Sequence, residues 1–415
     1  MNCRHCATPI DRVFVDLGLQ PSANRLLTAA EMAAIARGKP EPKFPLKVLF
    51  CPACGLVQLA DFRRPEDMFT SDYVYFSSYS GSWVEHARRY ADMVQRRFAL
   101  DEKSLVVEIA SNDGYLLQNF VAKKIPCLGI DPAQKAADAA REKGVETVVD
   151  FFGTDLAQRL ARGERGGRGR ADLIAGNNVL AHVPDINDFV RGIHALLKDD
   201  GAVTLEFPHL ARLVENAQFD TIYDEHYSYL SLATVRAIFA RFGLMVFDVE
   251  ALPTHGGSLR VYGCREGRRA VEPAVAAILA EEKALGLDRL DKHQGFQARV
   301  EGIRDDFLAL VAREKTAGTR IAAFGAAAKG NIFLNYCGVG ADVIDFVVDD
   351  TPAKQGRFLP GSHVPVVAED VFKERKSGLV VILPWNFAPE IKRRLDYGRA
   401  WGVRFVTCIP GVTVS

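Results

Sequence analysis

The fold of this chain is decided by the stretch Val106-Val107-Glu108-Ile109-Ala110-Ser111-Asn112-Asp113-Gly114-Tyr115-Leu116. Its apolar beginning predicts a strand, its small and acidic middle predicts a tight turn, and a helix should follow. Apolar runs at 105–110, 127–130, 172–175 and 202–207 alternate with helical segments. This alternation is typical of a parallel sheet with crossover helices, so we expect an α/β core in this part of the chain.

The turn after this first strand is typical of a site for S-adenosylmethionine. Small residues let the backbone approach the methionyl part of that cofactor, with an acid near its amino group. The next strand ends at Asp131, which can accept hydrogen bonds from ribose hydroxyls. Because a G-x-G-x-x-G pattern is missing, a nicotinamide cofactor is the weaker choice. Phe151 is placed for an adenine neighbourhood, although such phenylalanines are more often core. The residues expected to bind the cofactor are Glu108, Ala110, Asn112, Asp113, Gly114, Asp131, Pro132, Phe151, Asn177 and Asn178.

The composition of the 415 residues is that of a globular protein with two or three packed units. Lys plus Arg and Asp plus Glu both number 52, so no basic surface is expected for nucleic acid or for an anionic membrane. The N-terminus lacks an apolar signal core, and no stretch stays apolar for the roughly 18 residues of a membrane span. We therefore expect a cytoplasmic protein without nucleic-acid or membrane partners.

Four of the eight cysteines form two C-x-x-C pairs in the first part of the chain. Each pair makes a tight knuckle, and two knuckles complete a tetrahedral metal site with no open position for catalysis. The alternative is a set of four unrelated buried thiols. The pattern favours a structural zinc ion bound by Cys3, Cys6, Cys51 and Cys54.

Two later segments carry histidines that suit proton transfer. The first, 176–185, places His182 at the carboxyl edge of the sheet, although spacing alone would also fit a structural histidine. The second, 222–229, crowds two acids, three phenols and an imidazole into eight residues. Removing a proton next to a ketone needs a base near neutral pH and donors that hold an enolate, which makes His226 the natural base. The alternative is a tyrosine-rich loop packed between domains.

The C-terminal part predicts a second α/β unit. Strands are expected at 320–324, 343–348 and 379–383, with helices between them. A small-residue turn at 325–328 precedes Lys329, and backbone amides at such a helix start suit a phosphate or pyrophosphate. The later strands end on the same edge of this sheet, so we expect one shared ligand face.

Over essentially its whole length the chain resembles the bacterial deoxysugar C-methyltransferases, which alkylate dTDP-linked 4-keto sugars. The resemblance rests on the order and spacing of these segments: the four cysteines with Pro21-Ser22-Ala23-Asn24, Tyr75-Phe76-Ser77-Ser78-Tyr79, Glu108 to Gly114, Asn177 to Pro184, Tyr223 to His226, His255-Gly256-Gly257-Ser258, and the regions of Lys329 and Asn386. It implies an N-terminal zinc-binding module at 1–66, a central Rossmann-like class I methyltransferase domain at 67–265, a helical connection at 266–318 and a C-terminal Rossmann-like domain at 319–415 that binds the sugar nucleotide. It also implies a monomer.

The resemblance assigns roles to individual residues of the site. His226 matches the family's base, and Tyr223, Glu225 and His182 line the same site. We expect Glu225 to orient the His226 ring, and His182 and Tyr223 to donate hydrogen bonds to the enolate oxygen. One linker tyrosine, either Tyr75 or Tyr79, reaches the sugar in this family. The residues expected to hold the substrate are Ser78, His255, Lys329, Asn331, Lys354 and Asn386.

The reaction implied by the resemblance is transfer of a methyl group from S-adenosylmethionine to a nucleotide-linked keto sugar. The acceptor is the carbon next to the C4 ketone, expected to be C3, and the intermediate is an enolate. Methylation at C5 and methylation of a sugar oxygen are the alternatives within enzymes. A sugar-nucleotide-binding regulatory protein is an alternative of another class, but it would leave the cluster at 223–226 without a task.

Overall fold

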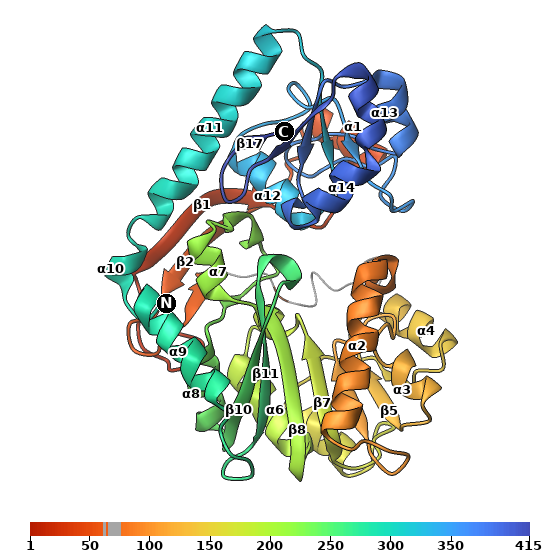
Figure 1. Ribbon diagram of the computed structural model, residues 1–415, viewed down its shortest axis with the longest axis vertical. Helices are drawn as coiled ribbons and strands as arrows, with labels where there is room; N and C mark the ends of the chain where they lie inside the picture. Colours follow the sequence, from red (N-terminus) through yellow and green to blue (C-terminus); the bar gives the residue numbers. More distant parts are fainter. Residues whose placement is uncertain (61–63, 65–75) are drawn as a thin grey trace.

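The computed structural model describes residues 1–60, 64 and 76–415, and these residues form three sheets. Figure 1 shows a seven-stranded sheet in the lower half of the view and a six-stranded sheet in the upper half. The long strand β1 (Val13–Pro21), drawn in red, runs between the two halves and belongs to the third sheet. The N-terminal segment therefore connects the two larger sheets.

The seven-stranded sheet has the order β10-β11-β8-β7-β4-β5-β6. The strands from β8 to β6 are parallel, whereas β11 is antiparallel to β8 and β10 is antiparallel to β11. The carboxyl ends of the parallel strands meet at one edge, where ligands bind in open α/β sheets. This order confirms the predicted α/β core. The strands are β4 (Val106–Ile109), β5 (Cys127–Ile130), β6 (Thr147–Val148), β7 (Ala171–Asn177), β8 (Leu197–Pro208), β10 (Leu244–Leu252) and β11 (Ser258–Arg265).

Helices cover both faces of this sheet, which explains why β4 is buried along its whole length. Tyr90 and Phe120 pack on one face, and Phe189 and Phe239 pack on the other. The crossover and flanking helices are α2 (Gly81–Arg97), α3 (Gln118–Ala122), α4 (Gln134–Glu142), α5 (Thr154–Ala161), α6 (Ile186–Leu196), α7 (Leu210–Glu215) and α8 (Leu232–Arg241). The apolar runs of the sequence are therefore strands that are shielded from water on both sides.

The six-stranded sheet has the order β14-β13-β12-β15-β16-β17 and is parallel except for β17. Its strands are β12 (Ile321–Phe324), β13 (Val347–Val348), β14 (Val366–Val367), β15 (Leu379–Ile382), β16 (Arg404–Thr407) and β17 (Thr413–Val414). Its helices are α12 (Ala328–Tyr336), α13 (Glu369–Arg375) and α14 (Ala388–Arg394). The second parallel sheet predicted from the sequence is thus present.

The third sheet joins the N-terminal segment to the central part of the chain. Its order is β1-β2-β3-β9, with β2 (Lys43–Phe50), β3 (Val57–Leu59) and β9 (Ser228–Tyr229). Between β1 and β2 the chain forms α1 (Ala29–Ala36) and pairs Leu27 with Phe358 of the C-terminal part. Strand β9 is the last part of the segment 222–229 that carries His226, and sequence periodicity gave no sign of this pairing.

A helical connection links the two larger sheets, as the sequence predicts. It consists of α9 (Pro273–Leu285), α10 (Leu290–His293) and α11 (Phe296–Thr316). The ring of Phe296 stacks on Phe14 of β1 with centroids 4.9 Å apart, which fastens the connection to the N-terminal sheet. Among the described residues, no helix is both long and apolar enough to cross a membrane.

Candidate active site

The four paired cysteines converge on one point at the N-terminal end of the third sheet. Their Sγ atoms all lie within 4.8 Å of one another. Four thiolates at this spacing are the tetrahedral donor set of a structural zinc ion. Gln58 on β3 donates a hydrogen bond from Nε2 to Cys3 Sγ at 3.2 Å, which ties the metal site to that strand. The chain therefore has the zinc site that the spacing of Cys3, Cys6, Cys51 and Cys54 predicts.

The turn after β4 has a strained backbone. Ala110 (φ 58°), Asn112 (φ 48°) and Gly114 (φ 74°) lie in the left-handed region, and Asn178 (φ 53°) does so at the end of neighbouring β7. Three of these residues are not glycine and disfavour this conformation. Such strain concentrates at ligand sites because the surrounding structure must hold it in place. All four residues are among those predicted to bind the cofactor.

Two buried acids lie near the carboxyl ends of the adjacent strands β4 and β5: Glu108 is in β4, and Asp131 directly follows β5. Burial raises the pKa of Glu108 well above its usual range, and Tyr115 opposes this shift in part. Burial also raises the pKa of Asp131 to about 6. The two carboxylate oxygens of Asp131 accept hydrogen bonds from the backbone N–H groups of Asn112 and Ala133, both at 2.9 Å. Asp131 therefore fixes the strained turn, and each oxygen retains a lone pair for a further donor.

Asp113 is held from two sides. Lys143 Nζ lies 2.9 Å from Asp113 Oδ2, and Ser78 Oγ donates to the same oxygen. The backbone N–H of Ser77 donates to Asn112 Oδ1 at 2.8 Å. Ser78, which we expected to hold the substrate, therefore closes over the cofactor turn.

The structure describes one of the two linker tyrosines, Tyr79. Tyr75 lies outside the described residues. Tyr79 is 64% exposed, and its ring packs edge-on against Phe76 with centroids 5.4 Å apart. The structure thus places Tyr79 at the surface.

The remaining predicted cofactor residues lie along the same edge. Asn177 is buried at the end of β7, with Nδ2 3.5 Å from the Tyr115 hydroxyl. Pro132 is partly buried directly after Asp131, and Phe151 is 39% exposed after β6. Phe151 thus has a free surface that a flat ring could cover, whereas its neighbour Phe152 packs into the core.

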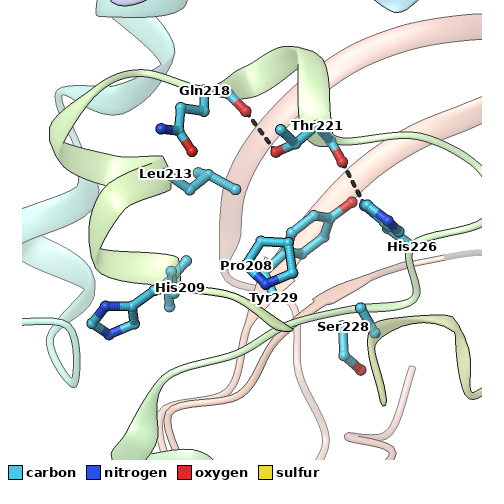
Figure 2. Close-up of a pocket in the computed structure, with 10 residues that line it drawn as sticks. Pro208, His209, Leu213, Gln218, Thr221, His226, Ser228 and Tyr229 are labelled. Atoms are coloured by element: carbon cyan, nitrogen blue, oxygen red, sulfur yellow. Dashed lines mark hydrogen bonds between the residues drawn. The ribbon is translucent and has the colours of Figure 1, made fainter. Parts of the chain in front are cut away.

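His226 lies close to Tyr223 of its own segment, 222–229, and to His182 of the segment 176–185. The ring centroid of His226 is 3.9 Å from that of Tyr223 and 4.6 Å from that of His182. His226 Nδ1 donates a hydrogen bond to the backbone carbonyl of Thr221 at 2.7 Å, as Figure 2 shows. Because a neutral imidazole carries one N–H, this bond leaves the lone pair of Nε2 to accept a proton.

Both imidazoles are buried and neutral. Burial and, after it, His182 lower the pKa of His226 well below its usual range. Burial lowers the pKa of His182 to about 4, and the backbone carbonyl of Glu225, which accepts a hydrogen bond from the His182 ring, opposes this in part. The arrangement therefore provides an uncharged base at neutral pH.

Asp224 and Glu225 hold the segment 222–229 against the N-terminal module. Asp224 Oδ1 accepts from the backbone N–H of Ala23 at 3.0 Å, and Glu225 Oε1 accepts from Asn24 Nδ2 at 2.9 Å. We expected Glu225 to orient the His226 ring, but the group that receives Nδ1–H is the Thr221 carbonyl. That expectation was wrong. The partner is a backbone carbonyl, and a sequence pattern shows which side chains are present but not which carbonyl lies beside the ring.

A small cavity adjoins the base (Figure 2). Apolar atoms make up most of its surface, although six of the ten residues that line it are polar. The residues that line it are Ala181, Pro208, His209, Leu210, Leu213, Gln218, Thr221, His226, Ser228 and Tyr229. Strand β9, which pairs with β3 next to the metal site, therefore forms one wall of the cavity beside His226.

Lys329 projects from the first turn of α12 in the C-terminal part. Its Nζ lies 4.7 Å from the centroid of the Trp385 ring and 3.5 Å from Asn386 Oδ1. Burial lowers its pKa, and the charge of Asp220 opposes this. The positive charge of Lys329 also lowers the pKa values of His226 and His255.

The other residues predicted to hold the substrate differ in their surroundings. Lys354 Nζ donates to the carbonyl of Ala326 at 2.9 Å and lies 3.2 Å from Asp349 Oδ2. It thus closes the strand-end loop of its own sheet, where we expected a contact with the substrate. Asn331 is fully buried, and its Oδ1 accepts from Asn335 Nδ2 at 3.1 Å.

His255 lies on a strained loop that faces the C-terminal part. His255 has φ 56° and Gly256 has φ 88°. A Cβ atom on Gly256 would lie 2.3 Å from a carbon of the Trp385 ring, so only glycine fits there. The His255 ring packs edge-on against Trp83 with centroids 5.1 Å apart, and burial lowers its pKa to about 4.

A buried ion pair between Arg260 and Glu206 lies next to the loop that carries His255. Arg260 Nη2 lies 2.8 Å from Glu206 Oε2, which also lies 2.9 Å from His86 Nε2. Thr254 Oγ1 donates to Glu206 Oε1 at 2.9 Å, directly before His255. The sequence analysis missed this network because its members lie on α2, β8, β11 and a loop, far apart along the chain.

Comparisons with known proteins agree with this architecture. Residues 3–69 match a zinc binding domain family, residues 83–249 match the family "Methyltransferase domain", and residues 253–410 match the family "C-methyltransferase C-terminal domain". The chain is 35% identical to the C-methyltransferase NovU of Streptomyces niveus over 409 residues, which covers 98% of this chain and 95% of that one.

Solved structures resemble the chain over about half its length. Magnesium protoporphyrin IX methyltransferase of Synechocystis with bound S-adenosylhomocysteine is 15% identical and covers 44% of this chain and 83% of its own, with a TM-score of 0.34. A Burkholderia thailandensis 1,6-didemethyltoxoflavin-N1-methyltransferase is 17% identical and covers 51% and 95%, with a TM-score of 0.36. The family assignment rests on the sequence matches: the chain belongs to the NovU-like C-methyltransferases and is an S-adenosylmethionine-dependent C-methyltransferase with a four-cysteine zinc site.

Proposed function

We propose that this enzyme methylates the carbon next to the ketone of a nucleotide-linked 4-keto deoxysugar, at C3, with His226 as the base. The observation that carries the proposal is the hydrogen bond from His226 Nδ1 to the Thr221 carbonyl in a buried site. It fixes one tautomer and aims the basic nitrogen away from the backbone. A dTDP-linked sugar is the substrate that we expect.

His226 removes the proton, since a ketone makes the neighbouring C–H acidic and the neutral imidazole has a lone pair on Nε2 at neutral pH. The positive charge that forms on the ring is stabilised by the Thr221 carbonyl, which accepts from Nδ1–H. S-adenosylmethionine, bound at the β4 turn, supplies an electrophilic methyl group on its sulfonium. The nucleophile that receives it is the enolate carbon.

Tyr223 is the donor that we assign to the enolate oxygen. Its ring lies 3.9 Å from that of His226, so both can reach adjacent atoms of one substrate. We expected His182 to donate as well. A neutral imidazole has one N–H, and the Glu225 carbonyl already accepts from the His182 ring, so we assign His182 to packing the base.

Lys329 is the group that we assign to the diphosphate of the sugar nucleotide. Its ammonium is partly buried beside Asn386, at the start of a helix whose amides favour an anion. Its positive charge lowers the pKa of His226, which supports placing the two groups in one site. Holding the nucleotide there would bring the sugar to the base and reduce the entropic cost of reaction.

The proposal is tested by hydrogen exchange at carbon. The enzyme is incubated in deuterated water with S-adenosylhomocysteine and a panel of dTDP- and GDP-linked 4-keto-6-deoxy sugars, and NMR follows deuterium entering the sugar. We expect enzyme-dependent exchange at C3 of one sugar. Exchange at C5 would correct the position. Binding without exchange at any carbon would contradict a base next to the ketone and favour methylation of an oxygen.

The pH dependence of turnover follows from the lowered pKa of His226. The base works only when neutral, and burial keeps it neutral to lower pH than an ordinary histidine. We expect kcat to stay level from about pH 8 to about pH 6 and to fall only below the usual histidine range. The measurement is kcat at saturating substrate across this range. An acid limb centred at or above about pH 6.5 would contradict the assignment.

A further inference from the structure

One side chain of the C-terminal part touches both candidate functional loops of the central part. Trp385 begins the short helix η6 (Trp385–Phe387), which is separated from β15 by Leu383 and Pro384. Its Nε1 donates a hydrogen bond of 2.6 Å to Asp220 Oδ2, and its ring lies against Gly256, next to His255. The other ring contact is with Lys329, whose Nζ is 4.7 Å from the ring centroid. The indole therefore lies between the residue assigned to the diphosphate and two loops of the methyltransferase sheet.

Asp220 belongs to the turn that holds the base. The turn is the short helix η4 (Phe219–Thr221), and its last residue offers the carbonyl that accepts from His226 Nδ1. Asp220 is 1% exposed, and burial raises its pKa to about 6. A buried carboxylate needs donors, and the indole N–H is one of them.

The same turn is packed on the C-terminal part by aromatic contacts. The Phe219 ring lies 5.3 Å from the Tyr336 ring and 6.0 Å from the Phe333 ring, both on α12. Lys329 lies in the first turn of the same helix. Helix α12, which carries Lys329, thus packs against the η4 turn, which carries the Thr221 carbonyl.

From these contacts we infer that Trp385 is a positioning residue: its N–H, acting on Asp220, holds the η4 turn so that the Thr221 carbonyl keeps His226 in its working tautomer and orientation. The inference rests on the proposed role of His226. It connects binding of the sugar nucleotide by the C-terminal part to the orientation of His226 in the central part. The sequence predicts these two parts as separate domains. Trp385 does not itself touch the reacting atoms.

The test is the variant Trp385→Phe, which keeps an aromatic ring against Gly256 and below Lys329 but removes the N–H. Loss of a hydrogen bond to a buried charged group should lower kcat and the rate of substrate C–H exchange together, by about tenfold to a hundredfold. KM for the sugar nucleotide and for S-adenosylmethionine should change by less than about threefold, because the ring contacts remain. The imidazole N–H signal of His226 in the NMR spectrum should shift or broaden.

The matched control is Trp401→Phe. Trp401 is in the same domain, and its Nε1 donates to the backbone carbonyl of Ser377 at 3.2 Å, away from the site. This variant should leave kcat, exchange and the His226 signal unchanged. If Trp401→Phe lowered exchange as much as Trp385→Phe does, general loosening of the domain would explain the effect and the inference would be wrong.

A second variant keeps the test sharp if Trp385→Phe is poorly folded. Asp220→Ala removes the acceptor of the same hydrogen bond and should lower exchange to a similar degree. The double variant should lose little more than either single one, because both act through one contact. Additive losses, or wild-type exchange in Trp385→Phe, would overturn the inference. Absence of exchange in the wild-type enzyme would instead overturn the proposed base itself, so the two failures are distinguishable.

Discussion

Replacing His226 with Asn should lower methyl transfer by about 10²–10⁴-fold, the range that a positioned general base contributes. The Asn side chain can place its amide N–H near the position of Nδ1, so the hydrogen bond to the Thr221 carbonyl can persist. It cannot accept the substrate proton. Exchange of the substrate C–H in the presence of S-adenosylhomocysteine should therefore be lost together with turnover.

The control for this variant is His194→Asn. His194 is on α6, where its ring contacts Arg265 far from the site residues in the fold. It should keep full turnover and exchange. Binding of S-adenosylmethionine by His226→Asn, measured by calorimetry, should match the wild type because the β4 turn is untouched. Substantial turnover by His226→Asn would remove this residue from the role of base.

Loss of the zinc ion should be the second large effect. We expect Cys54→Ser to lower the zinc content from about one ion per chain, to lower the melting temperature by about 5–10 °C and to reduce turnover more than tenfold. A serine hydroxyl stays protonated and is a poor zinc ligand. The measurements are elemental analysis, calorimetric unfolding and the methyl-transfer rate on the same preparation.

The effect on turnover follows from how the zinc module holds the base. Leu59, which follows the second cysteine pair, and Arg4, which lies between Cys3 and Cys6, both donate hydrogen bonds to the carbonyl of Tyr227, at 3.0 and 2.9 Å. Gln58 pairs with Ser228 in the ladder of β3 and β9. Tyr227 is the residue next to His226. Loss of the metal should therefore disorder the segment that holds His226 as well as the N-terminal segment.

The matched control is Cys127→Ser. Cys127 is a buried thiol on β5 that lies outside the four-cysteine set. This variant should keep its zinc and most of its activity, with at most a modest loss of stability from a hydroxyl in an apolar core. A Cys54→Ser enzyme that keeps both zinc and turnover would refute the structural role given to the metal.

Local chemistry in the sequence was enough to predict the parts of this protein. The C-x-x-C spacing predicts the metal site because chelation is decided by residues close in the chain. The apolar run that ends at Ile109 and the turn that follows predict the first strand and the tight turn after it, because burial and backbone conformation are encoded there. The helical connection and the second parallel sheet follow from periodicity in the same way.

The tertiary structure alone decided how those parts meet. The strand β9 is two residues long and has no periodicity of its own, so its pairing with β3 depends on partners 170 residues away. Lys354 and Ser78 were assigned to the substrate, and the structure gives each a carboxylate of its own domain instead.

The partner of the base was likewise out of reach of the sequence. The Thr221 carbonyl that holds His226 is a backbone group, and every residue has one. The indole N–H that holds Asp220 comes from a different sheet. Motifs record which side chains are present, whereas hydrogen bonds between distant segments depend on packing, and only the folded chain determines which carbonyl and which indole lie beside the base.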